Sequence, residues 1–351
     1  MSFMKTPRLL HLDIIRGIAA LSVFFAHFHH PISIFINNIL NHTIGVNNGL
    51  HFGVVIFIVL SGFCIHLPNA EVNNLSDILW KKYFLKRFFR VVPVLIVGIL
   101  LGLLVYNISF FSESEFNIFH LVKLYFKLIV VNPFYFIGLN GPIGNIILAT
   151  VIVELWLYVT YPIVFYLARK FGLILTFFFA CLLYLIPFFC SFGLQIKIDG
   201  AWLISSSYYG FLILWIMGFI SAELLVRYKK FIKNDVLIWI ALCTLYFTIG
   251  TIFKFDKLHY LLTPMLGLIV AIFLLKYEYL QIYFPNCGYL LIKIFVYIGT
   301  ISYSLYAIHL PIITVLDSKE NYNINFCIIL VSVLLTYYII EKPFMLMMKK
   351  L

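Results

Sequence analysis

Charged residues are scarce in this chain. Only 11% of its 351 residues are charged, whereas 63% are hydrophobic and 19% are aromatic. An average soluble domain carries about 25% charged residues, because polar side chains have to cover much of its exterior. The composition excludes an ordinary soluble protein. It predicts a polytopic integral membrane protein that forms a single domain over residues 1–351, with no separate soluble domain.

Two further absences limit the possible functions. The six cysteines are scattered and form no C-x-x-C pair, so the sequence predicts neither a disulfide framework nor a metal site. The first apolar run carries Asp13 and Arg16 and lacks a small-residue cleavage site. We therefore expect a retained first helix and not a cleavable signal peptide.

Apolar runs of about 20 residues are long enough to cross a membrane as helices. Their number predicts an all-α bundle of about ten transmembrane helices. A further stretch, 119–138, is interrupted by Lys123, Lys127 and Pro133, so we interpret it as re-entrant or interfacial. The ten predicted spans cover about 9–28, 49–67, 91–107, 145–168, 171–192, 207–226, 235–253, 258–275, 295–314 and 324–345.

The lysines and arginines favour one orientation of this bundle. With the N-terminus in the cytoplasm, the predicted cytoplasmic segments hold about three times as many of them as the outer segments. This bias predicts that both termini are cytoplasmic. The net charge of +11 is then mostly a topology signal, which argues against a nucleic-acid partner.

The first span carries charged residues that a bilayer tolerates only at some expense. Arg16 and His27 are eleven residues apart, which places them on one helix face with a rise of about 16 Å between them. Asp13 lies one turn before Arg16 and is expected to form a structural ion pair with it. The alternative without a function is that Asp13 and Arg16 only neutralise each other and that His27 is an interfacial histidine.

Basic residues also precede the third span, in the segment WKKYFLKRFFR. Arginine side chains suit bidentate phosphate binding, so Arg87 and Arg90, with Lys86, are candidates for binding a phosphorylated ligand. The alternative is an ordinary positive membrane anchor.

Two further ionisable residues lie within predicted spans. Glu154 lies mid-span with Tyr158 one turn later, and it is either a catalytic carboxylate or a structural partner for a basic group such as Arg16. His309 lies near the outer end of the ninth span, as a further candidate site residue or as an interfacial histidine.

These motifs together resemble the acyltransferase 3 family of membrane-bound O-acyltransferases over nearly the whole chain. The resemblance rests on the spacing of Arg16 and His27 and on the arginine-x-x-arginine motif of Arg87 and Arg90. It also rests on three further stretches, which are GVVIFIVLSGFCI, the helix of Glu154, Tyr158 and Pro162, and SYSLYAIHLP followed by EKPF. The family's glutamate helix usually begins with tryptophan-serine and holds two adjacent acids. Here Ala149, Thr150 and Leu155 stand at those positions.

The resemblance implies an acyl-CoA donor, most often acetyl-CoA, as a substrate and not as a tightly bound cofactor. It implies acceptor hydroxyls on cell-envelope glycans, such as lipopolysaccharide O-antigen, capsule or exopolysaccharide, and a place in the bacterial inner membrane. His27 would act as general base or form an acyl-imidazole, with Glu154 as a carboxylate that could orient it. Arg16, Arg87 and Arg90 would hold the donor. Two alternatives are a transporter or flippase of an amphiphile, and an acyltransferase for a lipid or small-molecule acceptor.

Overall fold

Helices make up most of the chain that the structure describes. The computed structural model describes residues 10–28, 52–110, 123, 126, 129–130, 144–193, 208–227, 243–246, 259–275, 289–316 and 321–350, and no strand occurs in these ranges. This confirms the all-α prediction. Six helices in these ranges are long and apolar enough to cross a membrane, which agrees with an integral membrane protein. The layout of ten spans and its orientation stay predictions.

The main helices follow one another with their apolar residues in long, nearly unbroken runs, as expected for helices that lie in a bilayer. Short 3-10 helices, η2 and η3, occupy Leu67–Asn69 and Leu75–Asp77. The longer elements are α1 (Leu10–His27), α3 (Phe52–His66), α4 (Trp80–Phe110), α6 (Leu148–Phe171), α7 (Leu173–Gly193), α9 (Tyr208–Arg227), α11 (His259–Leu275), α13 (Tyr289–Val315), α14 (Tyr322–Thr336), the π-helical turn η8 (Tyr337–Glu341) and α15 (Lys342–Lys350).

Several observed boundaries differ from the predicted spans, and α13 for example begins at Tyr289 and not at residue 295. The third span was predicted from residue 91, but α4 begins at Trp80, so its basic segment is helical and continuous with the apolar part. The last span is not one uniform helix, because the π-helical turn η8 separates α14 from α15. The predicted span 235–253 lies outside the described residues except for 243–246, as does most of 119–138.

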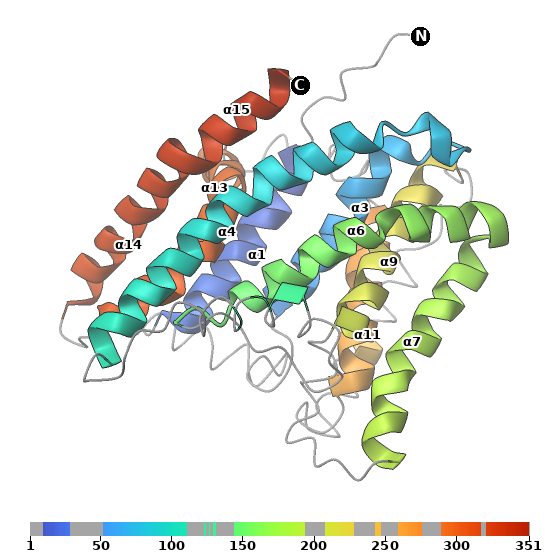
Figure 1. Ribbon diagram of the computed structural model, residues 1–351, viewed down its shortest axis with the longest axis horizontal. Helices are drawn as coiled ribbons and strands as arrows, with labels where there is room; N and C mark the ends of the chain where they lie inside the picture. Colours follow the sequence, from blue (N-terminus) through green and yellow to red (C-terminus); the bar gives the residue numbers. More distant parts are fainter. Residues whose placement is uncertain are drawn as a thin grey trace.

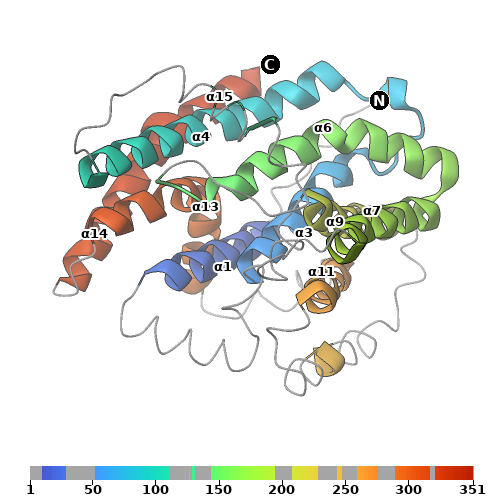
Figure 2. The same ribbon diagram turned by 60° about the horizontal axis from the view of Figure 1, so that its bottom comes forward.

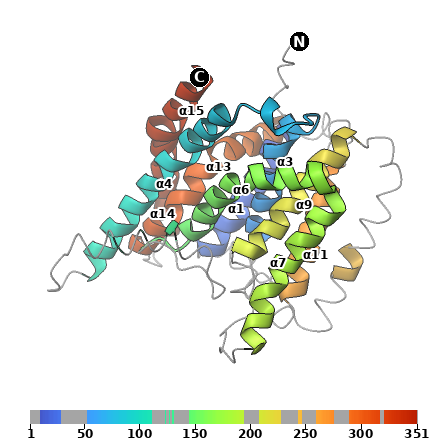
Figure 3. The same cartoon turned by 45° about the vertical axis from the view of Figure 1, so that its right-hand side comes forward.

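Helices that are distant in sequence form the centre of the bundle. Figures 1 and 3 show α4, α14 and α15 on one side and α7, α9 and α11 on the other, with α1, α3 and α13 between them. In Figure 2, α1 lies between α13 and α3. The most extensive helix pairs are α1 with α13 and α3 with α9. The first helix is therefore enclosed by protein, as its charged residues require.

Glycines allow the two central pairs of helices to touch backbone to backbone. A Cβ atom added at Gly17 would overlap the Phe295 carbonyl, and one added at Gly299 would overlap the Asp13 carbonyl. Gly62 and Gly218 make the corresponding contact between α3 and α9. Small residues permit this close approach in membrane helices. The first crossing brings α13 directly against the charged part of α1.

A cluster of buried charges joins α3, α6 and α9 at one end of the bundle. Glu223 is only 2% exposed, and its carboxylate lies 2.5 Å from both His66 Nε2 and Arg169 Nη1, and 2.6 Å from Arg227 Nε. Both arginines also donate to the Ala70 and Val72 carbonyls. Arg227 lies one turn after Glu223 on α9, whereas His66 and Arg169 come from α3 and α6. The cluster fixes the turn that leads from α3 into α4.

Replacing Glu223 tests the importance of this cluster for stability. We expect Glu223→Gln to lower the free energy of unfolding by about 3 to 5 kcal/mol, because the partly buried Arg169 guanidinium then loses its buried counter-charge. Thermal unfolding of detergent-solubilised protein, followed by fluorescence-detected size exclusion, measures the change. Glu71→Gln is the matched control, since Glu71 is exposed in the same turn. Equal melting temperatures for the two variants would contradict the assignment.

Candidate active site

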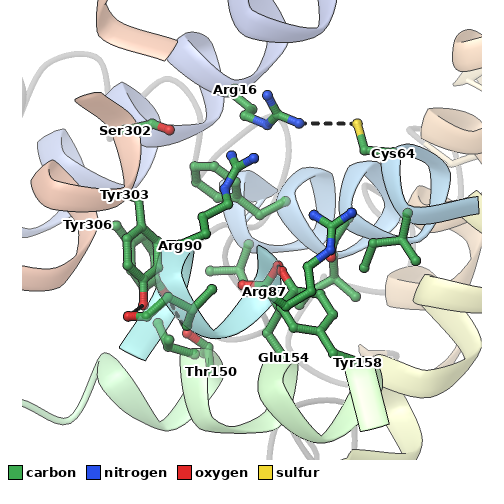
Figure 4. A pocket seen from close by; sticks show the side chains of 17 residues that line it. Arg16, Cys64, Arg87, Arg90, Thr150, Glu154, Tyr158, Ser302, Tyr303 and Tyr306 are labelled. Atoms are coloured by element: carbon green, nitrogen blue, oxygen red, sulfur yellow. Dashed lines mark hydrogen bonds between the residues drawn. The ribbon is translucent and has the colours of Figure 1, made fainter. Parts of the chain in front are cut away.

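Five helices surround a cavity that contains three arginines. α1, α3, α4, α6 and α13 contribute its walls, and Figure 4 shows Arg16, Arg87 and Arg90 around it. Its empty volume, open mouth included, is about 740 Å³. The polar residues that line it with the arginines are Ser61, Cys64, Thr150, Glu154, Tyr158, Ser302, Tyr303 and Tyr306.

The two arginines of α4 enter the cavity because helical spacing places them on one face. Residues three apart on a helix are surface neighbours, and Arg87 and Arg90 both line the cavity. Lys86 is exposed and is not among the lining residues. The structure therefore brings two of the three predicted basic residues of α4 into the site and leaves the third outside it.

Arg16 enters the same cavity from α1 and is held by a carboxylate. Its Nη1 lies 2.9 Å from Asp13 Oδ1, and its Nη2 lies 3.1 Å from the Cys64 sulfur. Asp13 is only 8% exposed. The ion pair fixes the direction of the guanidinium, because both side chains rise from the same helix one turn apart.

Glu154 lies in the arginine cavity on α6. The hydroxyl of Tyr158, one turn later, donates a hydrogen bond to its carboxylate, and both side chains line the cavity (Figure 4). Among the described residues, this is the only hydrogen bond of Glu154, so its remaining lone pairs are available to the cavity. The structure therefore places Glu154 in the same cavity as Arg16, Arg87 and Arg90.

The positive charge of the cavity exceeds its negative charge. In the described parts of the chain, no carboxylate forms an ion pair with Arg87 or Arg90. The Arg87 Nε atom is buried and has no hydrogen-bond partner there. Buried polar groups without partners are rare in native proteins. The cavity is therefore suited to an anionic ligand that provides the missing acceptors.

A pair of histidines lies beyond the cavity, between α1 and α13. The ring centroids of His27 and His309 are 5.4 Å apart. His27 Nδ1 lies 2.8 Å from the Val23 carbonyl, and His309 Nδ1 lies 2.9 Å from the Leu305 carbonyl. A carbonyl oxygen can only accept, so each Nδ1 carries the hydrogen. In a neutral imidazole the lone pair is then on Nε2, as a general base requires.

Tyr306 lies between the arginine cavity and the histidine pair. Its side chain lines the cavity, its hydroxyl lies 2.6 Å from Thr150 Oγ1, and its ring centroid is 6.2 Å from that of His309. The site therefore has two parts. One contains Arg16, Arg87, Arg90 and Glu154, and the other contains the two histidines.

Sequence reasoning did not single out several residues of the cavity. Cys64, Thr150, Tyr303 and Tyr306 are uncharged, so their presence in an apolar helix gave no signal of function. Cys64, Tyr303 and Tyr306 belong to stretches that carried the family resemblance, and Thr150 stands at a position where the family pattern was not met. The motif stretches were thus the only available indication of these residues.

Comparison with protein families agrees with this geometry. A family model described as an acyltransferase domain matches residues 9–341, nearly the whole chain. The chain belongs to the acyltransferase 3 family. No curated protein and no solved structure matched it. The protein is accordingly a membrane acyltransferase, and the matched region includes every helix that lines the cavity of this acyltransferase 3 protein.

Cys64 allows the electrostatic potential of the cavity to be measured directly. In a variant that retains only this cysteine, we expect a negatively charged methanethiosulfonate reagent to react about tenfold faster than a positively charged one, because clefts lined by one sign of charge concentrate counter-ions. A variant that retains only Cys327, which is exposed on α14, is the control. Mass spectrometry gives both rates. A preference for the cationic reagent at Cys64, as at Cys327, would contradict a positive cavity.

Proposed function

We propose that the protein transfers an acyl group, preferably acetyl, from acyl-CoA to a hydroxyl of a cell-envelope glycan. The acceptor would be lipopolysaccharide O-antigen, capsule or exopolysaccharide, with the donor bound from the cytoplasmic side of a bacterial inner membrane. The observation that carries this proposal is the cavity in which, among the described residues, neither Arg87 nor Arg90 forms an ion pair with a carboxylate. Coenzyme A carries three phosphate groups, which arginines bind well.

In this proposal, the donor extends from the arginines towards the histidines. Arg87 and Arg90 bind the phosphates, and Arg16 contacts the donor further along the cavity. The pantetheine arm then follows the buried stripe of α1, where Ala20 and Val23 are 2% and 1% exposed. The rise of about 16 Å between Arg16 and His27 is comparable to the length of that arm.

The chemical step uses the imidazole of His27 as a base. Its Nε2 accepts the proton of the acceptor hydroxyl while the hydroxyl oxygen forms a bond to the thioester carbonyl carbon. The carbon–sulfur bond then breaks, and the proton passes to the leaving thiolate of CoA. Val23 and His309 orient the His27 ring, and Glu154 offsets part of the arginine charge.

Replacing His27 tests the chemical role. We expect His27→Ala to lower the rate of acetyl transfer by about 100- to 10,000-fold, which is the range for a lost general base, without changing the amount of protein in the membrane. His29→Ala, at the neighbouring histidine in the sequence, should retain activity. Radiolabelled acetyl-CoA in isolated membranes provides the assay. Loss of activity in His29→Ala with retention in His27→Ala would overturn the assignment.

Replacing the arginines tests donor binding. Hydrogen bonds to charged groups contribute about 1.5 to 3 kcal/mol each, so Arg87→Gln and Arg90→Gln should each raise the KM for acetyl-CoA by about ten- to a hundredfold. Lys86→Gln is the matched control on the exposed face of α4 and should change the KM by less than about twofold. If Lys86→Gln raised the KM for acetyl-CoA as much as the arginine variants, the donor would be attracted by the positive surface of α4 in general and not bound by the cavity.

The acceptor is tested in cells. Mass spectrometry of envelope glycans from strains with and without the gene should show a difference of one acetyl group per repeat unit. Unchanged glycans, together with acetyl-CoA turnover by the purified protein, would indicate a lipid or small-molecule acceptor.

A further inference from the structure

Two tyrosine rings flank the Arg87 guanidinium. Its central carbon lies 5.6 Å from the ring centroid of Tyr83 and 5.7 Å from that of Tyr158. Both distances are within the range of a cation–π interaction. Tyr83 stands one turn before Arg87 on α4, while Tyr158 comes from α6, and Figure 4 shows its ring beside Arg87.

Tyr83 is fixed in place by its surroundings. It is 8% exposed, and its hydroxyl donates to the Tyr158 carbonyl at 3.1 Å. Its ring lies against that of Tyr161, with centroids 5.2 Å apart. The Tyr161 hydroxyl in turn accepts a hydrogen bond from Asn69 and lies 3.1 Å from His66 Nδ1. Packing therefore connects Tyr83 to the buried cluster around Glu223.

An aromatic neighbour affects an arginine differently from a carboxylate. Asp13 pairs with Arg16 and offsets its charge. The face of a tyrosine ring attracts a cation through its quadrupole and carries no net charge. The guanidinium of Arg87 is thus held in a defined position while its full charge and its N–H donors stay available to an anion.

We propose that Tyr83 is a positioning residue, which holds the Arg87 guanidinium ready to bind a phosphate group of the acyl donor. This proposal rests on the proposed function, because the anion is taken to be acyl-CoA. The ring of Tyr83, and not its hydroxyl, provides the interaction.

The test compares variants that keep or remove the ring. Tyr83→Leu should raise the KM for acetyl-CoA by about fivefold, as expected for the loss of one partly buried cation–π contact, and should leave kcat within about twofold. Tyr83→Phe keeps the ring and should have the same KM for acetyl-CoA as the wild-type protein. If Tyr83→Leu does not yield folded protein, Tyr83→Met fills similar space without a ring and carries the same expectation.

A double-mutant cycle separates positioning from general packing. In an Arg87→Gln background, Tyr83→Leu should not raise the KM further, because the two substitutions remove the same interaction. Phe88→Leu, at an exposed aromatic position of α4, is the control and should leave the KM unchanged.

The outcomes distinguish this proposal from the function on which it rests. If wild-type protein saturates with acetyl-CoA but Tyr83→Leu has an unchanged KM, this proposal alone is overturned. The same holds if Tyr83→Phe behaves like Tyr83→Leu, or if the effect persists in the Arg87→Gln background. If wild-type protein shows no saturable dependence on acetyl-CoA, both proposals are overturned.

Discussion

The site depends on an excess of positive charge that is held inside an apolar bundle. Arg16, Arg87 and Arg90 share one cavity, and within the described chain Asp13, Glu154 and Glu341 are carboxylates that lie near one or more of them. Charges in membrane helices are unfavourable unless they are compensated. Interactions are also stronger where water is excluded. An anion that enters the cavity therefore gains more from these arginines than it would at a protein surface.

The cluster around Glu223 shows that arginines also have a structural role in this protein. Arg169 and Arg227 both reach Glu223 and the carbonyls of the turn after α3, so their donors are used within the protein. Arg169 also lies over the ring of Phe165, but Arg87 has two tyrosine rings as neighbours and forms no ion pair among the described residues. The partners of an arginine, more than its burial, therefore distinguish a structural role from a role in binding a ligand.

The helix crossings determine how the two parts of the site meet. Because Gly17 and Gly299 let α1 and α13 touch, Arg16 of α1 shares the cavity with Tyr306 of α13, and His27 lies beside His309. α13 thus contributes to both parts, with Tyr306 at the cavity and His309 at the histidine pair. A ligand that spans the site would contact the same two helices along its length.

Some features of the protein followed from the sequence alone. Composition established a helical membrane protein, and the regular period of a helix placed Arg16 and His27 on one face, since both are local properties of the chain. The spacing of Arg87 and Arg90 put them together for the same reason. The start of α4 at Trp80 was missed because the span was predicted from its apolar residues alone, although lysine and arginine are also good helix formers.

The tertiary structure alone decided which residues surround the arginines. Tyr83, Cys64 and Tyr306 are neutral residues of apolar helices. Although Cys64 and Tyr306 lie in stretches that carried the family resemblance, nothing in the sequence indicated that they would lie near the arginines. His66, Arg169 and Glu223 come from three different helices. Contacts between helices depend on how their faces pack and on where small residues permit a crossing, and neither is fixed by the period of any single helix.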